Sequence, residues 1–215
     1  MYNLPHFKAS NQKEIMDFVN ENPFITLCGV TADLKPACTH VPVLIDVRED
    51  KIFLQAHIMR NQDHTKAFMQ NPNVLAIFSS QNHYVSASWY KDKMSGSTWN
   101  YQAVHMSGTM HFMDEEFLFR FLGRLTERFE QNPNSPSLVS KLDKSYVIEM
   151  MKAIVAFEIE VTNVQHVFKL SQNKDKESYE AIASKLENSD AAGKIISEKM
   201  KRRMNQVFSH EKSDD

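Results

Sequence analysis

Residues 98–112 read TWNYQAVHMSGTMHF, and this stretch carries the clearest structural pattern in the chain. From Val104 to Phe112, apolar residues at the even positions alternate with polar residues at the odd positions. A period of two predicts a β-strand that turns one face to a core and the other to solvent. The protein is therefore expected to be built around a sheet.

Further strands are predicted on both sides of this stretch. Runs rich in β-branched and aromatic residues predict strands over 24–31, 41–47, 52–55, 74–78 and 155–161. Pro42 has no N–H to donate, which places the second of these runs at a sheet edge or a bulge. In the last run, Glu158 and Glu160 are expected to face water.

Helices are predicted between and after these strands. Asn11 and Glu14 resemble a capping box, and Asp114 can cap the helix that follows it. Apolar residues at helical spacing predict further helices over 64–69, 117–129, 142–150, 179–186 and 196–207. Strands and helices do not alternate regularly, so we predict a mainly β fold with inserted helices, an antiparallel barrel rather than a doubly wound sheet.

The 215 residues suit one domain of 1–165, a helical extension of 166–209 and a disordered tail of 210–215. The net charge is −2 and the pI about 6.5, so the overall charge of the chain gives no sign of a broad DNA-binding face. Cys28 and Cys38 form no CxxC motif, and two buried thiols are expected rather than a disulfide or a metal site. No signal peptide or membrane span is expected, which predicts a cytoplasmic protein.

Four polar-aromatic clusters are not required by core packing: AHIMR (56–60) with Lys66, YVSASWY (84–90), TWNY (98–101) and KLSQN (169–173). Together they match the needs of flavin mononucleotide. Arg60 and Lys66 suit the phosphate dianion. Flat aromatic walls and fixed polar groups suit the isoalloxazine ring. The candidates are Trp89, Trp99 and Tyr101 for the walls, and Ser86, Ser88, Asn100, Lys169 and Gln172 for the polar groups.

Each cluster also has an ordinary structural interpretation. Arg60 and Lys66 can be solvated surface charges, and the two tryptophans can be core or interface anchors. Ser171 and Asn173 can cap the following helix. The histidines His57, His105 and His111 can lie on the polar faces of strands.

The motifs resemble those of the PaiB-type FMN-binding negative transcriptional regulators, which are similar in fold to the flavin split barrels of pyridoxamine-phosphate oxidases. The matching segments are AHIMR, HYVSASWY (83–90), STWNYQAVHMSG (97–108), IVAFEIEV (154–161) and KLSQN. Departures from the family pattern stand at Ala56, Gln62, Asp63, Ser97 and Ala156, and also at Ser80, Gln81 and Asn82.

The resemblance implies an FMN-binding split β-barrel that forms a homodimer, with two flavin sites at the subunit interface. It adds two residues to the expected flavin site. The complete set is His57, Arg60, Lys66, Ser86, Ser88, Trp89, Trp99, Asn100, Tyr101, Lys169, Ser171 and Gln172.

Three functions remain open from the sequence. The first is a flavin-dependent sensor or regulator that answers to a small-molecule effector or a partner protein. Direct DNA contact lacks support, since the one dense basic run, residues 199–203, suits a solvated helix face. The second is a flavin-dependent oxidoreductase on a small molecule, with His57 or His105 as a proton donor. The third is a barrel that binds haem or another small ligand.

Overall fold

A computed structural model describes residues 1–208 of the chain. The tail predicted at 210–215 lies outside the described residues, as does the last position of the predicted extension. The chain folds into two compact units, each made of several segments. Unit 1 comprises 1–19, 79–104 and 165 onward, and unit 2 comprises 20–78 and 105–164.

Seven strands form a single sheet in the order β2-β1-β5-β6-β7-β4-β3. Their bounds are β1 Phe24–Val30, β2 Pro36–Pro42, β3 Leu44–Arg48, β4 Lys51–Met59, β5 Asn73–Val85, β6 Thr98–Phe112 and β7 Ile154–Lys169. The pairs β1–β2, β1–β5, β3–β4 and β4–β7 are antiparallel. This confirms the prediction of a mainly β fold and rules out a doubly wound parallel sheet.

The single strand predicted over 41–47 is wrong, because the chain forms two strands there. β2 ends at Pro42 and β3 begins at Leu44, and these strands lie at opposite edges of the sheet. Pro42 has no N–H for a ladder, whereas the N–H of Val43 donates to the carbonyl of Pro23 at 2.9 Å. The predicted edge position of Pro42 is confirmed.

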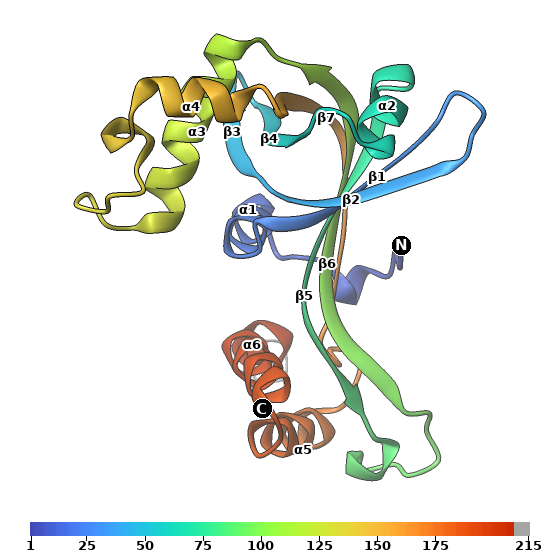
Figure 1. The fold of residues 1–215 in the computed structure, drawn as a ribbon. Helices are drawn as coiled ribbons and strands as arrows, with labels where there is room; N and C mark the ends of the chain where they lie inside the picture. Colours follow the sequence, from blue (N-terminus) through green and yellow to red (C-terminus); the bar gives the residue numbers. More distant parts are fainter. Residues whose placement is uncertain (209–215) are drawn as a thin grey trace. The chain divides into compact units, whose positions relative to one another are not determined.

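Four strands are longer than predicted, and one of them is β4, which covers Lys51–Met59 rather than 52–55. β5 continues to Val85, β6 begins at Thr98, and β7 continues to Lys169. β5, β6 and β7 each have residues in both units. The WNYQAVH motif is therefore part of one continuous strand (Figure 1).

In unit 2, helices pack on the sheet (Figure 1). They are α2 (Asp63–Gln70), α3 (Glu115–Glu130) and α4 (Lys144–Met151), with a 3-10 turn η3 (Val139–Lys141). Leu118, Val147, Met151 and Ala156 form one buried cluster that joins α3 and α4 to β7. Ala156, which replaces a glycine of the family pattern, therefore contributes its methyl group to this core.

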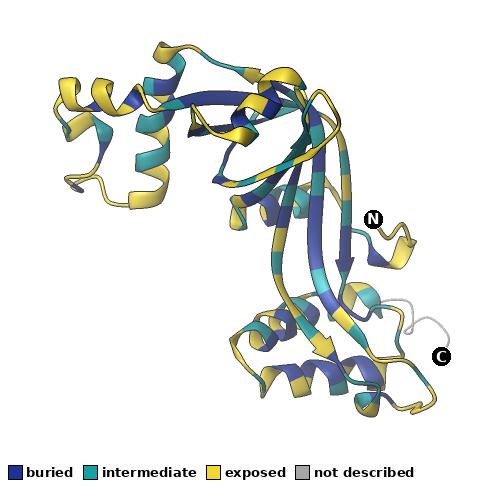
Figure 2. Ribbon diagram, turned by 45° about the vertical axis from the view of Figure 1, so that its right-hand side comes forward, coloured by how far each residue is buried: buried dark blue, intermediate teal, exposed yellow. Residues whose placement is uncertain are grey.

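In unit 1, helices α5 (Lys176–Glu187) and α6 (Ala191–Val207) pack against each other. The unit also holds α1 (Gln12–Glu21) and the 3-10 turns η1 (Pro5–Phe7) and η2 (Ala87–Trp89). Buried residues line the inner sides of α5 and α6, while their outer sides are exposed (Figure 2). Tyr179 is fully buried there, its hydroxyl donates to the carbonyl of Met200 at 2.9 Å, and burial raises its pKa.

The predicted helix caps at Asn11 and Asp114 are confirmed. The side chain of Asn11 accepts from the N–H of Glu14 at 2.9 Å, and that of Asp114 accepts from the N–H of Phe117 at 2.8 Å. The cap of α5 is Asp175, so the interpretation of Ser171 or Asn173 as this cap is wrong. None of the helices within residues 1–208 is both long and apolar enough to cross a membrane.

Candidate functional site

An exposed aromatic pair lies in unit 1, with Tyr84 near the end of β5 and Trp99 near the start of β6. Tyr84 and Trp99 are 43% and 52% exposed, and their ring centroids are 5.9 Å apart at an interplanar angle of 70°. Large aromatic side chains are normally covered, because each buries a large apolar area. Trp89, by contrast, is partly buried and packs against the cluster of α5 and α6.

Two serine hydroxyls lie on the turn that follows β5. The Oγ atoms of Ser86 and Ser88 are 2.8 Å apart, and the Ser86 hydroxyl also accepts from the N–H of Ser88 at 3.2 Å. The hydroxyl of Ser97 accepts from the N–H of Ala87 at 3.0 Å. Ser97 replaces a proline of the family pattern, and here it ties the SASWY turn to the start of β6.

Lys169 is the last residue of β7 and lies in unit 1. Its Nζ donates to Thr98 Oγ1 and lies 5.5 Å and 5.9 Å from the ring centroids of Tyr2 and Phe7. Burial lowers the pKa of Lys169 below its usual 10.5. Burial also raises the pKa of Tyr101, with a smaller contribution from Tyr2. Lys169 is thus a partly desolvated donor among aromatic rings.

The KLSQN segment forms the turn between β7 and α5. Ser171 adopts a left-handed φ of 64°, which is uncommon for a residue with a side chain. Its hydroxyl donates to Oδ1 of the fully buried Asn100 at 2.9 Å, and Asn100 Nδ2 donates to Met200 Sδ at 3.4 Å. Gln172 accepts from the N–H of Leu170 at 2.7 Å. Asn100, Ser171 and Gln172 therefore stabilise this turn.

Arg60 and Lys66, predicted to bind a phosphate, differ in their environments in unit 2. The guanidinium of Arg60 donates to the carbonyls of Ile154 at 2.8 Å and Lys152 at 3.3 Å. Lys66 is exposed on α2 and lies 3.9 Å from Asp63. Arg60 is thus held in place at the end of β4, whereas the exposed Lys66 side chain can reorient.

His57 lies shortly before Arg60 on β4, with its ring 5.9 Å from that of Phe121. Its Nδ1 is buried and has no hydrogen-bond partner among the described residues. Burial lowers the pKa of His57, which favours the neutral imidazole. A buried polar atom without a partner is costly, so this position suits a ligand group that completes the bond.

Nine of the twelve predicted residues lie in unit 1 and three in unit 2. The hydrogen bonds and ring contacts of unit 1 join Ser86 with Ser88, Trp99 with Tyr84, and Asn100 with Ser171. None of the twelve lines either of the two clefts described next.

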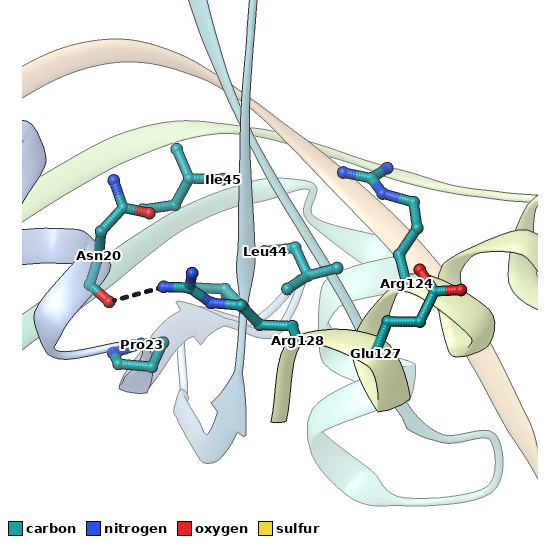
Figure 3. A pocket seen from close by; sticks show the side chains of 8 residues that line it. Asn20, Pro23, Leu44, Ile45, Arg124, Glu127 and Arg128 are labelled. Atoms are coloured by element: carbon teal, nitrogen blue, oxygen red, sulfur yellow. Dashed lines mark hydrogen bonds between the residues drawn. The ribbon is translucent and has the colours of Figure 1, made fainter. Parts of the chain in front are cut away.

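The first cleft lies in unit 2 and has a volume of about 460 Å³ (Figure 3). Its walls are the apolar residues Pro23, Val43, Leu44 and Ile45, together with Asn20, Arg124, Glu127 and Arg128. Sequence reasoning missed this cleft. The signal in the sequence was the spacing of Arg124 and Arg128, which places both side chains on one face of the predicted helix.

The two arginines of this cleft have hydrogen bonds but no carboxylate partner. Arg128 donates to the carbonyl of Asn20 at 3.2 Å (Figure 3). Arg124 donates to Gln55 Oε1 at 2.7 Å. Within residues 1–208, neither forms an ion pair. Two guanidinium groups beside an apolar wall suit a small molecule that carries an anionic group.

Glu158 is linked to Arg124 of this cleft through Gln55, and its predicted exposure to water is wrong. The carboxylate is buried, accepts from Gln55 Nε2 at 2.7 Å and pairs with Arg48 at 2.6 Å. Gln55 in turn accepts from Arg124 of α3. Glu158 is buried because the side chains of β4 and α3 cover this part of β7.

The second cleft, also in unit 2, has a volume of about 410 Å³ and is lined in part by Cys28, Gly29, Val74 and Gly108. The prediction of two buried thiols is wrong, since Cys28 is only partly buried and Cys38 is exposed. Groups of three or more His, Cys, Asp or Glu that could hold a metal do not occur in the described part of the chain.

The family model described as "Putative FMN-binding domain" matches residues 1–163. The chain belongs to this FMN-binding family. The predicted resemblance to PaiB-type proteins is thereby confirmed, and FMN is the cofactor. The family model ends before KLSQN, so that segment lies outside the matched region.

Relatives support the same assignment. The Bacillus subtilis protein "Protease synthase and sporulation protein PAI 2" is 33% identical over 190 residues, which are 88% of this chain and 91% of that protein.

Two solved structures share the fold. The FAD and heme binding protein of Mycobacterium smegmatis superposes with a TM-score of 0.59 at 16% identity, over 82% of this chain and 78% of that one. The Mycobacterium tuberculosis protein Rv2991 superposes with a TM-score of 0.55 at 18% identity, over 78% and 90%. The fold is the split barrel predicted from the sequence.

Proposed function

We propose that this protein is a flavin-dependent regulator of the PaiB type, which binds FMN through the twelve residues predicted from its sequence. The observation that carries the proposal is the exposed pair Tyr84 and Trp99 beside the Ser86 and Ser88 hydroxyls. An uncovered aromatic surface next to fixed hydroxyls suits the flat, amphipathic isoalloxazine ring.

The chemistry of the remaining residues fits the other parts of FMN. Arg60 keeps N–H donors beyond the two carbonyl bonds that orient it, and Lys66 adds an adjustable charge, so both suit the phosphate. Lys169 is a partly desolvated donor, suited to a flavin carbonyl or ring nitrogen. The unpaired Nδ1 of His57 would gain a partner from a ligand.

Asn100, Ser171 and Gln172 act indirectly in this proposal. Their side chains are engaged in the turn after β7, so they position Lys169 rather than contact the flavin within one chain. When bound, FMN supplies redox chemistry, and the protein supplies binding and orientation.

We further propose that the protein is a cytoplasmic homodimer in which the flavin lies at the subunit interface. Exposed aromatic surfaces such as Tyr84 and Trp99 are typical of interfaces between chains. A partner subunit would cover the ring and complete a site that one chain leaves open.

The cleft of Arg124 and Arg128 is proposed to bind the effector of this regulator. The preferred ligand is a small molecule with an apolar body and a carboxylate or phosphate, because an apolar wall faces two guanidinium groups that have no carboxylate partner. Thermal shift with a panel of such acids tests this. A shift that Arg124→Ala and Arg128→Ala abolish, but Arg120→Ala retains, supports the proposal, whereas no acid-specific shift contradicts it.

The FMN site is tested by titrating the apo-protein with FMN and following flavin fluorescence. We expect saturable binding with one FMN per chain, and dissociation constants at least tenfold weaker in Arg60→Ala and Trp99→Ala. Arg120→Ala is the matched control, because Arg120 is exposed on α3 and pairs only with Glu116. Unchanged affinity in both site variants, with both correctly folded, would contradict the site.

The same preparation separates regulator from oxidoreductase and from haem protein. Flavin and haem have different visible absorbance bands, so a spectrum identifies the bound group. Catalytic turnover of a small substrate, with the flavin cycling between its oxidised and reduced forms, would favour the enzyme. Effector-dependent change in flavin affinity without turnover supports the regulator.

A further inference from the structure

Cys28 and Cys38 face each other across the β1–β2 hairpin. They are directly paired in the antiparallel register, between the pairs Leu27–Thr39 and Gly29–Ala37. Their Sγ atoms are 3.6 Å apart. Two thiols this close can interact chemically without any rearrangement of the backbone.

The geometry of the pair permits a disulfide. Directly opposed residues in antiparallel strands have Cα atoms about 4.5–5.5 Å apart. Disulfides bridge Cα atoms separated by about 4.4–6.8 Å, with an S–S bond of about 2.05 Å. Side-chain rotation at Cys28 and Cys38 can therefore bring the sulfurs from 3.6 Å to bonding distance. β2 is an edge strand, so only one neighbouring strand must adjust.

The two thiols differ in their access to solvent. Cys38 is exposed, whereas Cys28 is partly buried. Burial, followed by the hydrogen bond with Cys38 and the charge of Cys38, raises the pKa of Cys28 to about 11. Cys28 therefore stays protonated at neutral pH, and an oxidant in solution reaches Cys38 first.

We propose that Cys28 and Cys38 form a reversible oxidation site, which hydroperoxides convert to an intramolecular disulfide. The Cys38 thiolate attacks the terminal peroxide oxygen, the S–O bond forms, and the O–O bond breaks. The alkoxide that leaves takes up a proton, so the products are a sulfenic acid on Cys38 and an alcohol, or water from hydrogen peroxide.

In the second step Cys28 acts as the resolving thiol. Its sulfur attacks Cys38, the S–S bond forms, the S–O bond breaks, and hydroxide leaves with the proton of Cys28 as water. In sum, two thiols and one hydroperoxide give a disulfide, an alcohol and water.

The disulfide would attach the edge strand β2 covalently to β1. Cys28 also lines the cleft of about 410 Å³, so oxidation changes one wall of that cleft. The site contains none of the proposed FMN residues. The proposal is therefore independent of flavin binding and can be tested on FMN-free protein.

The test is peroxide titration of the reduced full-length chain, followed by thiol counting with Ellman's reagent after denaturation. We expect free thiols to fall together from two per chain to none, and dithiothreitol to restore both. Asp33 lies between the cysteines, so Asp-N digestion gives peptides 17–32 and 33–45. These two peptides should stay joined after oxidation and separate after reduction.

Single variants identify the role of each thiol. Cys28→Ser should trap the sulfenic acid on Cys38, detected with dimedone. Cys38→Ser should leave Cys28 reduced under the same peroxide dose. A wild-type chain that keeps both thiols, that cross-links only between chains, or that oxidises Cys38 to sulfinic acid without joining peptides 17–32 and 33–45, would overturn the proposal.

Discussion

Replacement of Glu158 should reveal how strongly the buried network of β4, β7 and α3 stabilises unit 2. The Glu158 carboxylate accepts from Gln55 Nε2 at 2.7 Å and pairs with Arg48 at 2.6 Å. Gln55 is 2% exposed, so its amide has no access to water if Glu158 is removed. Arg48 is 47% exposed and can be solvated instead.

The magnitude follows from these two bonds. A hydrogen bond to a charged group contributes about 1.5–3 kcal/mol, and leaving a buried donor unsatisfied costs about 1–3 kcal/mol. The Arg48 pair is discounted because water screens it. Glu158→Ala is therefore expected to lower the free energy of unfolding by about 3 kcal/mol. In a chain of this size, that corresponds to a fall in Tm of about 6–12 °C.

Glu160→Ala is the matched control. Glu160 lies two positions further along β7 and pairs with Lys51 at 2.7 Å, but the Lys51 side chain is 61% exposed and that of Glu160 is 37% exposed. Surface pairs of this kind contribute less than about 1 kcal/mol. Urea unfolding followed by circular dichroism measures both variants. Equal losses for Glu158→Ala and Glu160→Ala would refute the assignment of Glu158 to a buried network.

Two more predictions concern unit 2. A Cβ on Gly108 would lie 2.2 Å from the backbone oxygen of Glu160, so Gly108→Ala should cost about 3 kcal/mol or more in the same urea assay. Gly123→Ala is its control, because a Cβ there meets nothing within 4 Å, and a loss in both variants alike would contradict the close approach. Burial holds the pKa of His57 below 6.5, so the unfolded chain binds the proton more readily and stability should fall as the pH drops below 6.5. His57→Gln should reduce this loss of stability when the free energy of unfolding is measured across that pH range. A loss of the same size in the wild type and the variant would contradict a lowered pKa of His57.

Local features of the structure were predictable from sequence. The alternation in 104–112 predicted a strand, and Asn11 and Asp114 predicted helix starts, because strand period and helix capping depend on a few neighbouring residues. The WNYQAVH and HYVSASWY segments identified the FMN-binding family. Strand ends were less predictable, since the polar ends of β5, β6 and β7 lack a clear alternation.

The candidate site was predictable only in part. The motifs predicted which residues belong to the proposed flavin site. They did not predict that Asn100 bonds to Ser171 or that Trp99 is exposed. The cleft of Arg124 and Arg128 was missed, because its walls come from segments about a hundred residues apart. No local sequence pattern predicts which distant segment covers a given side chain.

The sequence by itself determined the type of most elements, the helix caps, the edge position of Pro42 and the family with its cofactor. Only the tertiary structure decided that Glu158 is buried while Glu160 is only partly buried, although both occupy the same face of β7. The same holds for the 3.6 Å approach of Cys28 to Cys38, which depends on the register of β1 against β2. The physical reason is that period and capping are properties of neighbouring residues, whereas burial and pairing depend on how segments distant in sequence pack together.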